Sequence, residues 1–278
     1  MNLEPNDFEL IKLALAEDLA GGEDITSTAT ISESAISTGD FVARKDGVIA
    51  GIKVAEAVLR EVGLNEIVLL KADGDKVKAN DVLITVTGNT RKILLAERTA
   101  LNFFGHLSGV ATLTNTWVQA ISGTKCQIRD TRKTTPGMRL QEKAAVRMGG
   151  GTNHRLTLSD AALIKDNHIV AAGGVVAAFE KVRSLYPKSE IEIEVDTLEQ
   201  LAEVLSQNPD LVLLDNMTPA QCKEAVEFVK GRCKLEASGG ITLENACAYA
   251  ESGVDFMAIG ALTHSAPVFD IGLDLRVE

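Results

Sequence analysis

Residues 190–216 read EIEIEVDTLEQLAEVLSQNPDLVLLDN and place a helical pattern, 197–207, between two β-like segments, 190–196 and 211–216. Further β-like segments at 234–240 and 256–262 continue the series at a spacing of roughly 21–23 residues, which suits one strand and one helix per repeat. Alternating strands and helices predict a parallel sheet with right-handed crossovers.

Two earlier segments, 125–131 and 161–167, read as additional strands of the same sheet. Helical patterns at 219–231 and 242–253 separate the later strands, and Pro219 suits a first helical turn. About six strand–helix repeats indicate an α/β barrel related to the eightfold type.

The first part of the chain has a different pattern. Residues 7–20 predict a helix that ends at a glycine pair. Residues 40–88 predict an antiparallel sheet with a helix at 54–63 between its strands. A long helix over about 93–121 is expected to join this smaller domain to the barrel.

The charge distribution is uneven. Residues 129–155 hold seven Lys and Arg residues against two acids, a formal charge of +5, in a chain whose net charge is −11. Such a cationic stretch in an acidic protein favours a small, multiply charged anion as ligand. A nucleic acid is not expected, because it needs an extended basic surface, and the 4% aromatic content gives few platforms for base stacking.

The bulk properties indicate a cytoplasmic protein. The four cysteines form no C-x-x-C pair and lie among apolar neighbours, which is typical of reduced core cysteines. The first ten residues, MNLEPNDFEL, lack the features of a secretory signal, and no apolar run is long enough to cross a bilayer. No membrane partner is expected.

Polar residues follow each predicted barrel strand, where the chemistry of such barrels is carried out. The first two strands end in cations, Arg132, Lys133 and Lys165, whereas the next two end in carboxylates, Glu194 and Asp215. This division suits an anionic substrate on one side and a Mg²⁺-bound diphosphate on the other. The glycine-rich ends of the last strands offer backbone N–H groups to a phosphate, at Ser238, Gly239, Gly240 and Gly260.

Several of these residues have a purely structural interpretation as well. Lys165 and Glu194 could form an ion pair that closes the barrel, and Asp215 could cap the following helix. His106 and His264 are expected to be hydrogen-bonded structural residues. His154, just after a run of three glycines, is expected to contact a ligand.

Seven motifs along the chain resemble those of the quinolinate phosphoribosyltransferase family. They are DTRKTTPG (130–137), GGGTNHR (149–155), DAALIKDNHI (160–169), LLDN (213–216), SGGI (238–241) and GALTHS (260–265), with EVD at 194–196. The likeness covers most of the chain, from GGEDITS (21–27) to the tail at 269–274.

The resemblance implies a fold and a reaction. The fold is an open, irregular α/β barrel at 109–265 and a small α/β sandwich at 1–108. The C-terminal tail at 266–278 is expected to belong to the sandwich domain. The reaction is transfer of the phosphoribosyl group of 5-phosphoribosyl 1-pyrophosphate to quinolinate, with loss of CO₂ and diphosphate and with Mg²⁺. The product, nicotinate mononucleotide, belongs to de novo NAD synthesis. The family also implies a homodimer or an assembly of dimers.

The resemblance also implies residue roles. Quinolinate is expected to bind through its carboxylates to Arg132, Arg155 and Lys165 and to contact His154, and Thr131 lies in the same motif. Phosphoryl groups are expected at Lys133, Arg139 and Lys143, with the 5-phosphate on Ser238, Gly239, Gly240 and Gly260. Glu194 and Asp215 are expected to hold the ribose and the metal, and with Lys165 they are the catalytic candidates. Arg98 is expected to reach the partner subunit's site.

Three other functions remain open at this point. A lysine-dependent aldolase would use Lys165 as a Schiff base. A non-catalytic phosphate-binding regulator would keep the phosphate site but would have no need for Glu194 and Asp215. A family paralogue of the molybdenum-associated type would act on a different anion, whereas the complete arginine and lysine set favours quinolinate.

Overall fold

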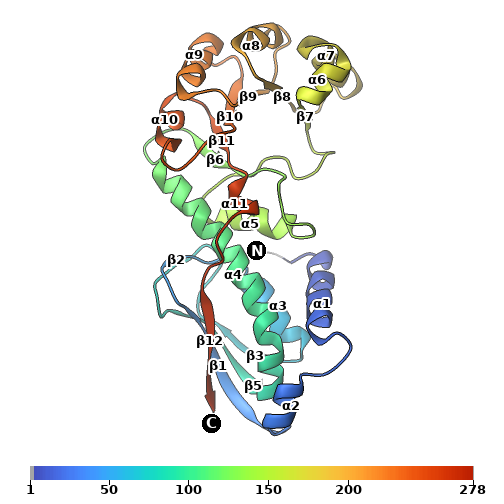
Figure 1. Ribbon diagram of the computed structural model, residues 1–278, viewed down its shortest axis with the longest axis vertical. Helices are drawn as coiled ribbons and strands as arrows, with labels where there is room; N and C mark the ends of the chain where they lie inside the picture. Colours follow the sequence, from blue (N-terminus) through green and yellow to red (C-terminus); the bar gives the residue numbers. More distant parts are fainter. Residues whose placement is uncertain (1–2, 278) are drawn as a thin grey trace. The chain divides into compact units, whose positions relative to one another are not determined.

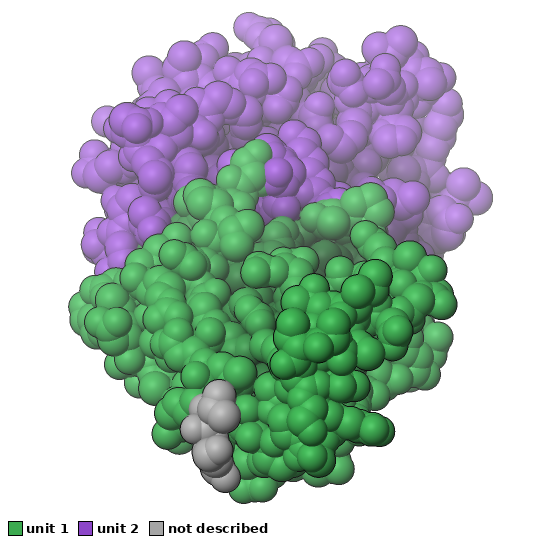
Figure 2. Space-filling model, turned by 60° about the horizontal axis from the view of Figure 1, so that its bottom comes forward, with its two compact units in different colours: residues 1–115, 135–150, 265–278 green, residues 116–134, 151–264 purple. Residues whose placement is uncertain are grey.

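The structure, a computed structural model, describes residues 3–277 and divides into two compact units (Figure 2). Unit 1 is built from residues 1–115, 135–150 and 265–278, and unit 2 from residues 116–134 and 151–264. Each unit has its own sheet (Figure 1). Among the described residues, no helix combines the length and the apolar character needed to span a membrane.

Unit 2 contains a six-stranded sheet in the order β6-β11-β10-β9-β8-β7, in which every neighbouring pair is parallel. Its strands are β6 (Gln127–Arg129), β7 (Ala162–Ile164), β8 (Ile191–Val195), β9 (Leu211–Asp215), β10 (Lys234–Ser238) and β11 (Phe256–Ala258). Within the described residues no pairing joins β6 to β7, so the barrel is open. The predicted parallel sheet and its six strands are confirmed.

Helices follow β7 to β11 in unit 2, and all but the short last one lie on the outer side of the strands (Figure 1). They are α6 (Asp166–Ala172), α7 (Val175–Leu185), α8 (Leu198–Leu205), α9 (Pro219–Val229), α10 (Ala246–Glu251) and α11 (Ala261–His264). The start of α9 has a local cause: Thr218 and Gln221 form a capping box, and Pro219 occupies the first turn. Lys230, in the left-handed conformation, ends the helix.

The alternation in β8 explains how the barrel acquires a polar interior. Its apolar residues, Ile191, Ile193 and Val195, are buried on one face of the strand, and Glu192 and Glu194 are buried on the other. The same period of two places Asp215 at the end of β9 and Ser238 at the end of β10, on the face that carries Glu194. The carboxyl ends of the parallel strands therefore gather polar side chains at one edge.

Unit 1 contains an antiparallel sheet in the order β12-β1-β5-β3 and a two-stranded sheet β2-β4. The strands are β1 (Ile36–Ala43), β2 (Gly47–Val48), β3 (Glu66–Leu69), β4 (Lys76–Val77), β5 (Val82–Asn89) and β12 (Ile271–Val277). Its helices are α1 (Pro5–Leu19), α2 (Ile25–Thr30), α3 (Ile52–Glu61), α5 (Arg139–Met148) and most of α4 (Thr90–Ala120), which continues into unit 2. The core of unit 1 includes Phe41, Leu59, Ile84 and Phe104.

The segment 135–150 differs from its sequence prediction, which placed it in the barrel domain at 109–265. In the structure it forms α5 and belongs to unit 1. The reason is a set of side-chain contacts: Gln141 bonds to Asp7 of α1, and Glu142 lies 2.8 Å from Nε2 of His106 on α4. A Cβ on Gly149 would lie 2.4 Å from the carbonyl oxygen of Ala111, so only glycine allows this approach to α4.

Candidate active site

Unit 2 has a pocket of about 680 Å³ at the carboxyl ends of its strands. All the site residues that the sequence predicted within unit 2 line it: Thr131, Arg132, Lys133, His154, Arg155, Lys165, Glu194, Asp215, Ser238, Gly239, Gly240 and Gly260. Most of them lie at the ends of the strands or in the loops that directly follow, whereas His154 and Arg155 come from the segment between α5 and β7. The barrel thus brings together side chains that are far apart in the sequence.

One part of the pocket wall is cationic. Arg132 and Arg155 both line it, and the Nε atom of each is buried with no hydrogen-bond partner among the described residues. Burial, together with the neighbouring Arg132, lowers the pKa of Arg155. Nη1 of Arg155 donates to the carbonyl oxygen of Ala161 at 2.8 Å, which fixes the guanidinium. Buried guanidinium donors of this kind are suited to an anionic ligand.

Lys133 is held at the pocket by its neighbours. The hydroxyl of Thr263 donates to its carbonyl oxygen at 2.8 Å, and its own N–H donates to Thr131 at 3.0 Å. A Cβ on Gly260 would lie 3.1 Å from both Lys133 and His264. Glycine at position 260 therefore lets these two side chains approach the end of β11.

Three carboxylates gather at the ends of β8 and β9. One oxygen each of Glu194, Asp196 and Asp215 lie within 4.8 Å of one another. Burial is the main cause of the raised pKa of Glu194 and of Asp215. The nearby negative charge of Asp196 raises the pKa of Asp215 further. Nζ of Lys165 lies 3.4 Å from Glu194, but the lysine side chain is 52% exposed. The two residues therefore pair at the mouth of the pocket and do not form the buried ion pair that the structural interpretation suggested.

This set of donors suits a hard divalent cation. Mg²⁺ prefers carboxylate oxygens and keeps several water or phosphate ligands. Glu194 and Asp215 line the open pocket, which leaves room for such ligands. The residues present are therefore compatible with a Mg²⁺ ion that arrives with a diphosphate.

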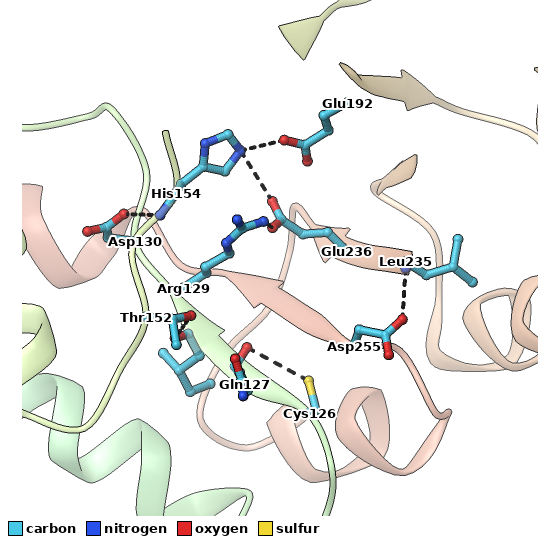
Figure 3. Close-up of polar contacts among 11 residues, drawn as sticks. Cys126, Gln127, Arg129, Asp130, Thr152, His154, Glu192, Leu235, Glu236 and Asp255 are labelled. Atoms are coloured by element: carbon cyan, nitrogen blue, oxygen red, sulfur yellow. Dashed lines mark hydrogen bonds and ion pairs between the residues drawn. The ribbon is translucent and has the colours of Figure 1, made fainter. Parts of the chain in front are cut away.

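His154 belongs to a buried charged cluster with Glu192, Glu236 and Arg129 (Figure 3). Nε2 of His154 is 2.8 Å from Glu192 and 3.7 Å from Glu236, and Nη1 of Arg129 is 2.8 Å from Glu236. Asp130 accepts the backbone N–H of His154 at 2.8 Å and fixes this turn of the chain. Burial raises the pKa of both glutamates to about 7. The ring of His154 is therefore held by carboxylates on the side of Nε2.

The loop after β10 supplies the glycine-rich end of the pocket. Gly239 and Gly240 have φ angles of +86° and +62°, in the left-handed region that favours glycine. The loop leads from Ser238, the last residue of β10. Successive backbone N–H groups in such a turn can bind an anion.

Three predicted site residues lie in unit 1 instead, and they do not line the pocket. Arg98 is exposed on α4, Arg139 is the first residue of α5, and Lys143 is fully buried on the same helix. The cationic stretch of the sequence is thus divided between the two units. Its helical part, α5, has its own buried contacts in unit 1.

The pocket also contains residues that the sequence did not single out. Asp166 and Asn216 follow β7 and β9, Glu236 lies within β10, and His264 ends α11. His264 was expected to be structural, whereas it lines the pocket. A signal for Asp166 and Asn216 was available, because both lie at the polar ends of the predicted segments 161–167 and 211–216. Nothing in the sequence alone marks Glu236 as a pocket residue.

Comparison with known proteins identifies relatives over nearly the whole chain. The family model for the quinolinate phosphoribosyl transferase N-terminal domain matches residues 24–108, and that for the C-terminal domain matches residues 110–274. A nicotinate-nucleotide pyrophosphorylase (carboxylating) from Mycobacterium leprae is 50% identical over 96% of both chains. A probable nicotinate-nucleotide pyrophosphorylase (carboxylating) from Bacillus subtilis is 38% identical over 98% of this chain and 96% of its own.

Solved structures agree with these matches. The nicotinate-nucleotide pyrophosphorylase of Francisella tularensis superposes with a TM-score of 0.92 at 40% identity, covering 99% of this chain and 98% of its own. That of Ehrlichia chaffeensis gives a TM-score of 0.94 at 38% identity, covering 99% and 100%. The likeness therefore extends over both units.

Proposed function

The chain belongs to the quinolinate phosphoribosyltransferase family, and on this premise we propose how its pocket carries out the family reaction. The enzyme transfers the phosphoribosyl group of 5-phosphoribosyl 1-pyrophosphate to quinolinate in de novo NAD synthesis, and nicotinate mononucleotide, CO₂ and diphosphate are the products. The cationic and acidic walls of the pocket divide the steps of this reaction between them.

Quinolinate carries two adjacent carboxylates on a pyridine ring, and we assign them to the cationic wall. Arg132 and Arg155 bind them through guanidinium donors, with Lys165 at the mouth of the pocket. The buried Nε atoms of Arg132 and Arg155 support this assignment, because such donors gain a partner when an anion binds. His154, held through Nε2, supports the ring of the substrate.

The acidic side of the pocket acts on the sugar. As diphosphate leaves C1 of the ribose, positive charge develops at that carbon, and Glu194 and Asp215 stabilise it. The same carboxylates hold the ribose hydroxyls and would hold Mg²⁺, which when bound would neutralise charge on the diphosphate. Lys133 contacts the phosphoryl groups, and the turn at Ser238–Gly240 together with Gly260 receives the 5-phosphate.

Loss of CO₂ follows attack of the pyridine nitrogen on C1. The quaternised ring accepts the electron pair as the C2 carboxylate departs, and a proton then adds at C2. A protein that held the C2 carboxylate tightly would oppose its loss. We therefore expect the C2 carboxylate to have fewer charged contacts than the C3 carboxylate, which stays in the product.

The proposed role of Arg98 depends on a homodimer. We propose that Arg98, exposed on α4, completes the site of a neighbouring subunit, and that Arg139 contributes to binding of phosphoryl groups. Lys143 is fully buried on α5, so we do not assign it the phosphoryl contact that the sequence suggested. The dimer itself, or a larger assembly of dimers, is part of this proposal. A cytoplasmic location is proposed as well, and the four free cysteines agree with a reducing compartment.

The single observation that supports these assignments most strongly is the division of charge around one pocket, with Arg132 and Arg155 on one wall and the carboxylates of Glu194 and Asp215 on another. The direct experiment is turnover. Purified protein with quinolinate, phosphoribosyl pyrophosphate and Mg²⁺ should release CO₂ and form nicotinate mononucleotide, and the chelator EDTA should stop the reaction. Turnover that is unchanged in EDTA would contradict the role of Mg²⁺.

A further inference from the structure

Asn216 occupies an unusual backbone position at the edge of the pocket. It directly follows β9 and has a φ angle of +53°. Only glycine, asparagine and aspartate adopt this left-handed conformation readily.

The contacts of Asn216 reach two different parts of the pocket. Its Nδ2 donates to Oδ2 of Asp215 at 2.7 Å, and its backbone N–H donates to the carbonyl oxygen of Ser238 at 2.8 Å. Its Oδ1 occupies the space beside Gly239, because a Cβ there would lie only 2.1 Å away. One residue thus contacts both the carboxylate at the end of β9 and the glycine turn after β10.

We propose that Asn216 is a positioning residue that fixes the spacing between Asp215 and the turn at Ser238–Gly240, and thereby sets the fit for phosphoribosyl pyrophosphate. This inference rests on the proposed function. The donor substrate carries its 5-phosphate and its diphosphate on opposite sides of one ribose, at a separation that covalent bonds limit. A pocket that binds both groups must hold its two ends at a matching distance.

A purely structural role for Asn216 makes a different prediction, and three variants separate the two. Asn216→Gly keeps the left-handed backbone but removes both side-chain contacts. Asn216→Asp keeps the shape and the backbone tolerance but replaces the donor to Asp215 with a carboxylate oxygen. Asn208→Gly is the matched control, because Asn208 has a φ angle of +52°, is exposed and does not line the pocket.

The readout is a comparison of the two substrates. In Asn216→Gly we expect KM for phosphoribosyl pyrophosphate and the Mg²⁺ concentration for half-maximal rate to rise about tenfold, as for loss of a hydrogen bond to a charged group. We expect a larger rise in Asn216→Asp. Binding of quinolinate alone, measured by calorimetry, should change less than about twofold, because Asn216 does not contact the cationic wall. Asn208→Gly should leave all these values unchanged.

Equal changes for both substrates in Asn216→Gly, or no change in KM for phosphoribosyl pyrophosphate, would overturn the inference. If the wild-type protein fails to turn over quinolinate, the proposed function fails separately. Calorimetric binding of phosphoribosyl pyrophosphate with Mg²⁺ then decides the inference. The inference predicts that phosphoribosyl pyrophosphate binds Asn216→Gly more weakly than the wild type. Equal binding would contradict the inference.

Discussion

Nε2 of His154 lies 2.8 Å from Oε2 of Glu192, and both side chains are more than nine-tenths buried. Glu192 does not line the pocket, whereas His154 does, so the carboxylate holds the ring from behind. Glu236 lies next to this pair and also accepts a bond from Arg129 (Figure 3). The position of the His154 ring in the pocket therefore depends on charged groups in the barrel interior.

The buried glutamates predict a pH dependence of stability. Burial raises the pKa of Glu236 to about 7 from an ordinary value of 4.5, so its contribution to stability is complete below about pH 4.5 and is lost as the pH rises through 7. As the pH rises from 4.5 to 7, we expect the free energy of unfolding to fall less in Glu236→Gln than in the wild type. Urea unfolding at a series of pH values measures this, with exposed Glu199→Gln as the control.

The slope of the free energy against pH is the quantity that decides this prediction. Parallel curves for the variant and the wild type between pH 4.5 and 7 would mean that Glu236 is ionised throughout this range.

Charge reversal at the cationic wall tests the quinolinate site. Arg132→Glu should lower kcat/KM for quinolinate at least about 100-fold, since a charge-assisted bond contributes about 1.5–3 kcal/mol and reversal adds repulsion. Arg183→Glu is the matched control, because Arg183 pairs with Asp210 on the surface of the same unit, outside the pocket. Its kcat/KM should stay within about twofold of the wild type. Substantial activity in Arg132→Glu would mean that the carboxylates of quinolinate bind elsewhere.

The glycine turn predicts a contrast between two glycines. Gly239→Ala introduces a methyl group 2.1 Å from Asn216, whereas Gly231→Ala, at a φ angle of +75°, has no heavy atom within 4 Å. Both variants should lose about 1–2 kcal/mol from the left-handed backbone. Only Gly239→Ala should also raise KM for phosphoribosyl pyrophosphate, by about tenfold or more. Similar kinetics for both would show that the turn does not bind phosphate.

The proposed dimer can be tested by mixing two inactive variants. If Arg98 serves the partner subunit's site, Arg98→Ala and Lys165→Ala impair complementary parts of the same composite site. Random reassembly of equal amounts should then restore about a quarter of the wild-type activity, because half of the dimers are mixed and each has one intact site. Activity that does not rise on mixing, although light scattering shows mixed dimers, would assign Arg98 to its own subunit.

The barrel was predictable from the sequence because its strand and helix signals are local. The alternation in 190–196 and the turn residues around α9 determine those elements without distant contacts. The charge of the strand ends likewise predicted Lys165, Glu194 and Asp215 as neighbours, because parallel strands share one edge.

The remaining features depend on contacts between distant residues. Arg139 and Lys143 belong to a charged stretch that reads as one site, yet Gln141 and Asp7 bring α5 into unit 1. Glu192 has the same pattern as Glu194, and its depth in the barrel follows only from its pairing with His154 and the register of the sheet. Such positions cannot be derived from spacing alone.

The most direct test of the central claim is a crystal structure of the protein with quinolinate bound. We predict that both carboxylates lie against Arg132 and Arg155 in the pocket of unit 2, with the C3 carboxylate making more charged contacts than the C2 carboxylate. Quinolinate bound on the side of Glu194 and Asp215, or outside this pocket, would contradict the account.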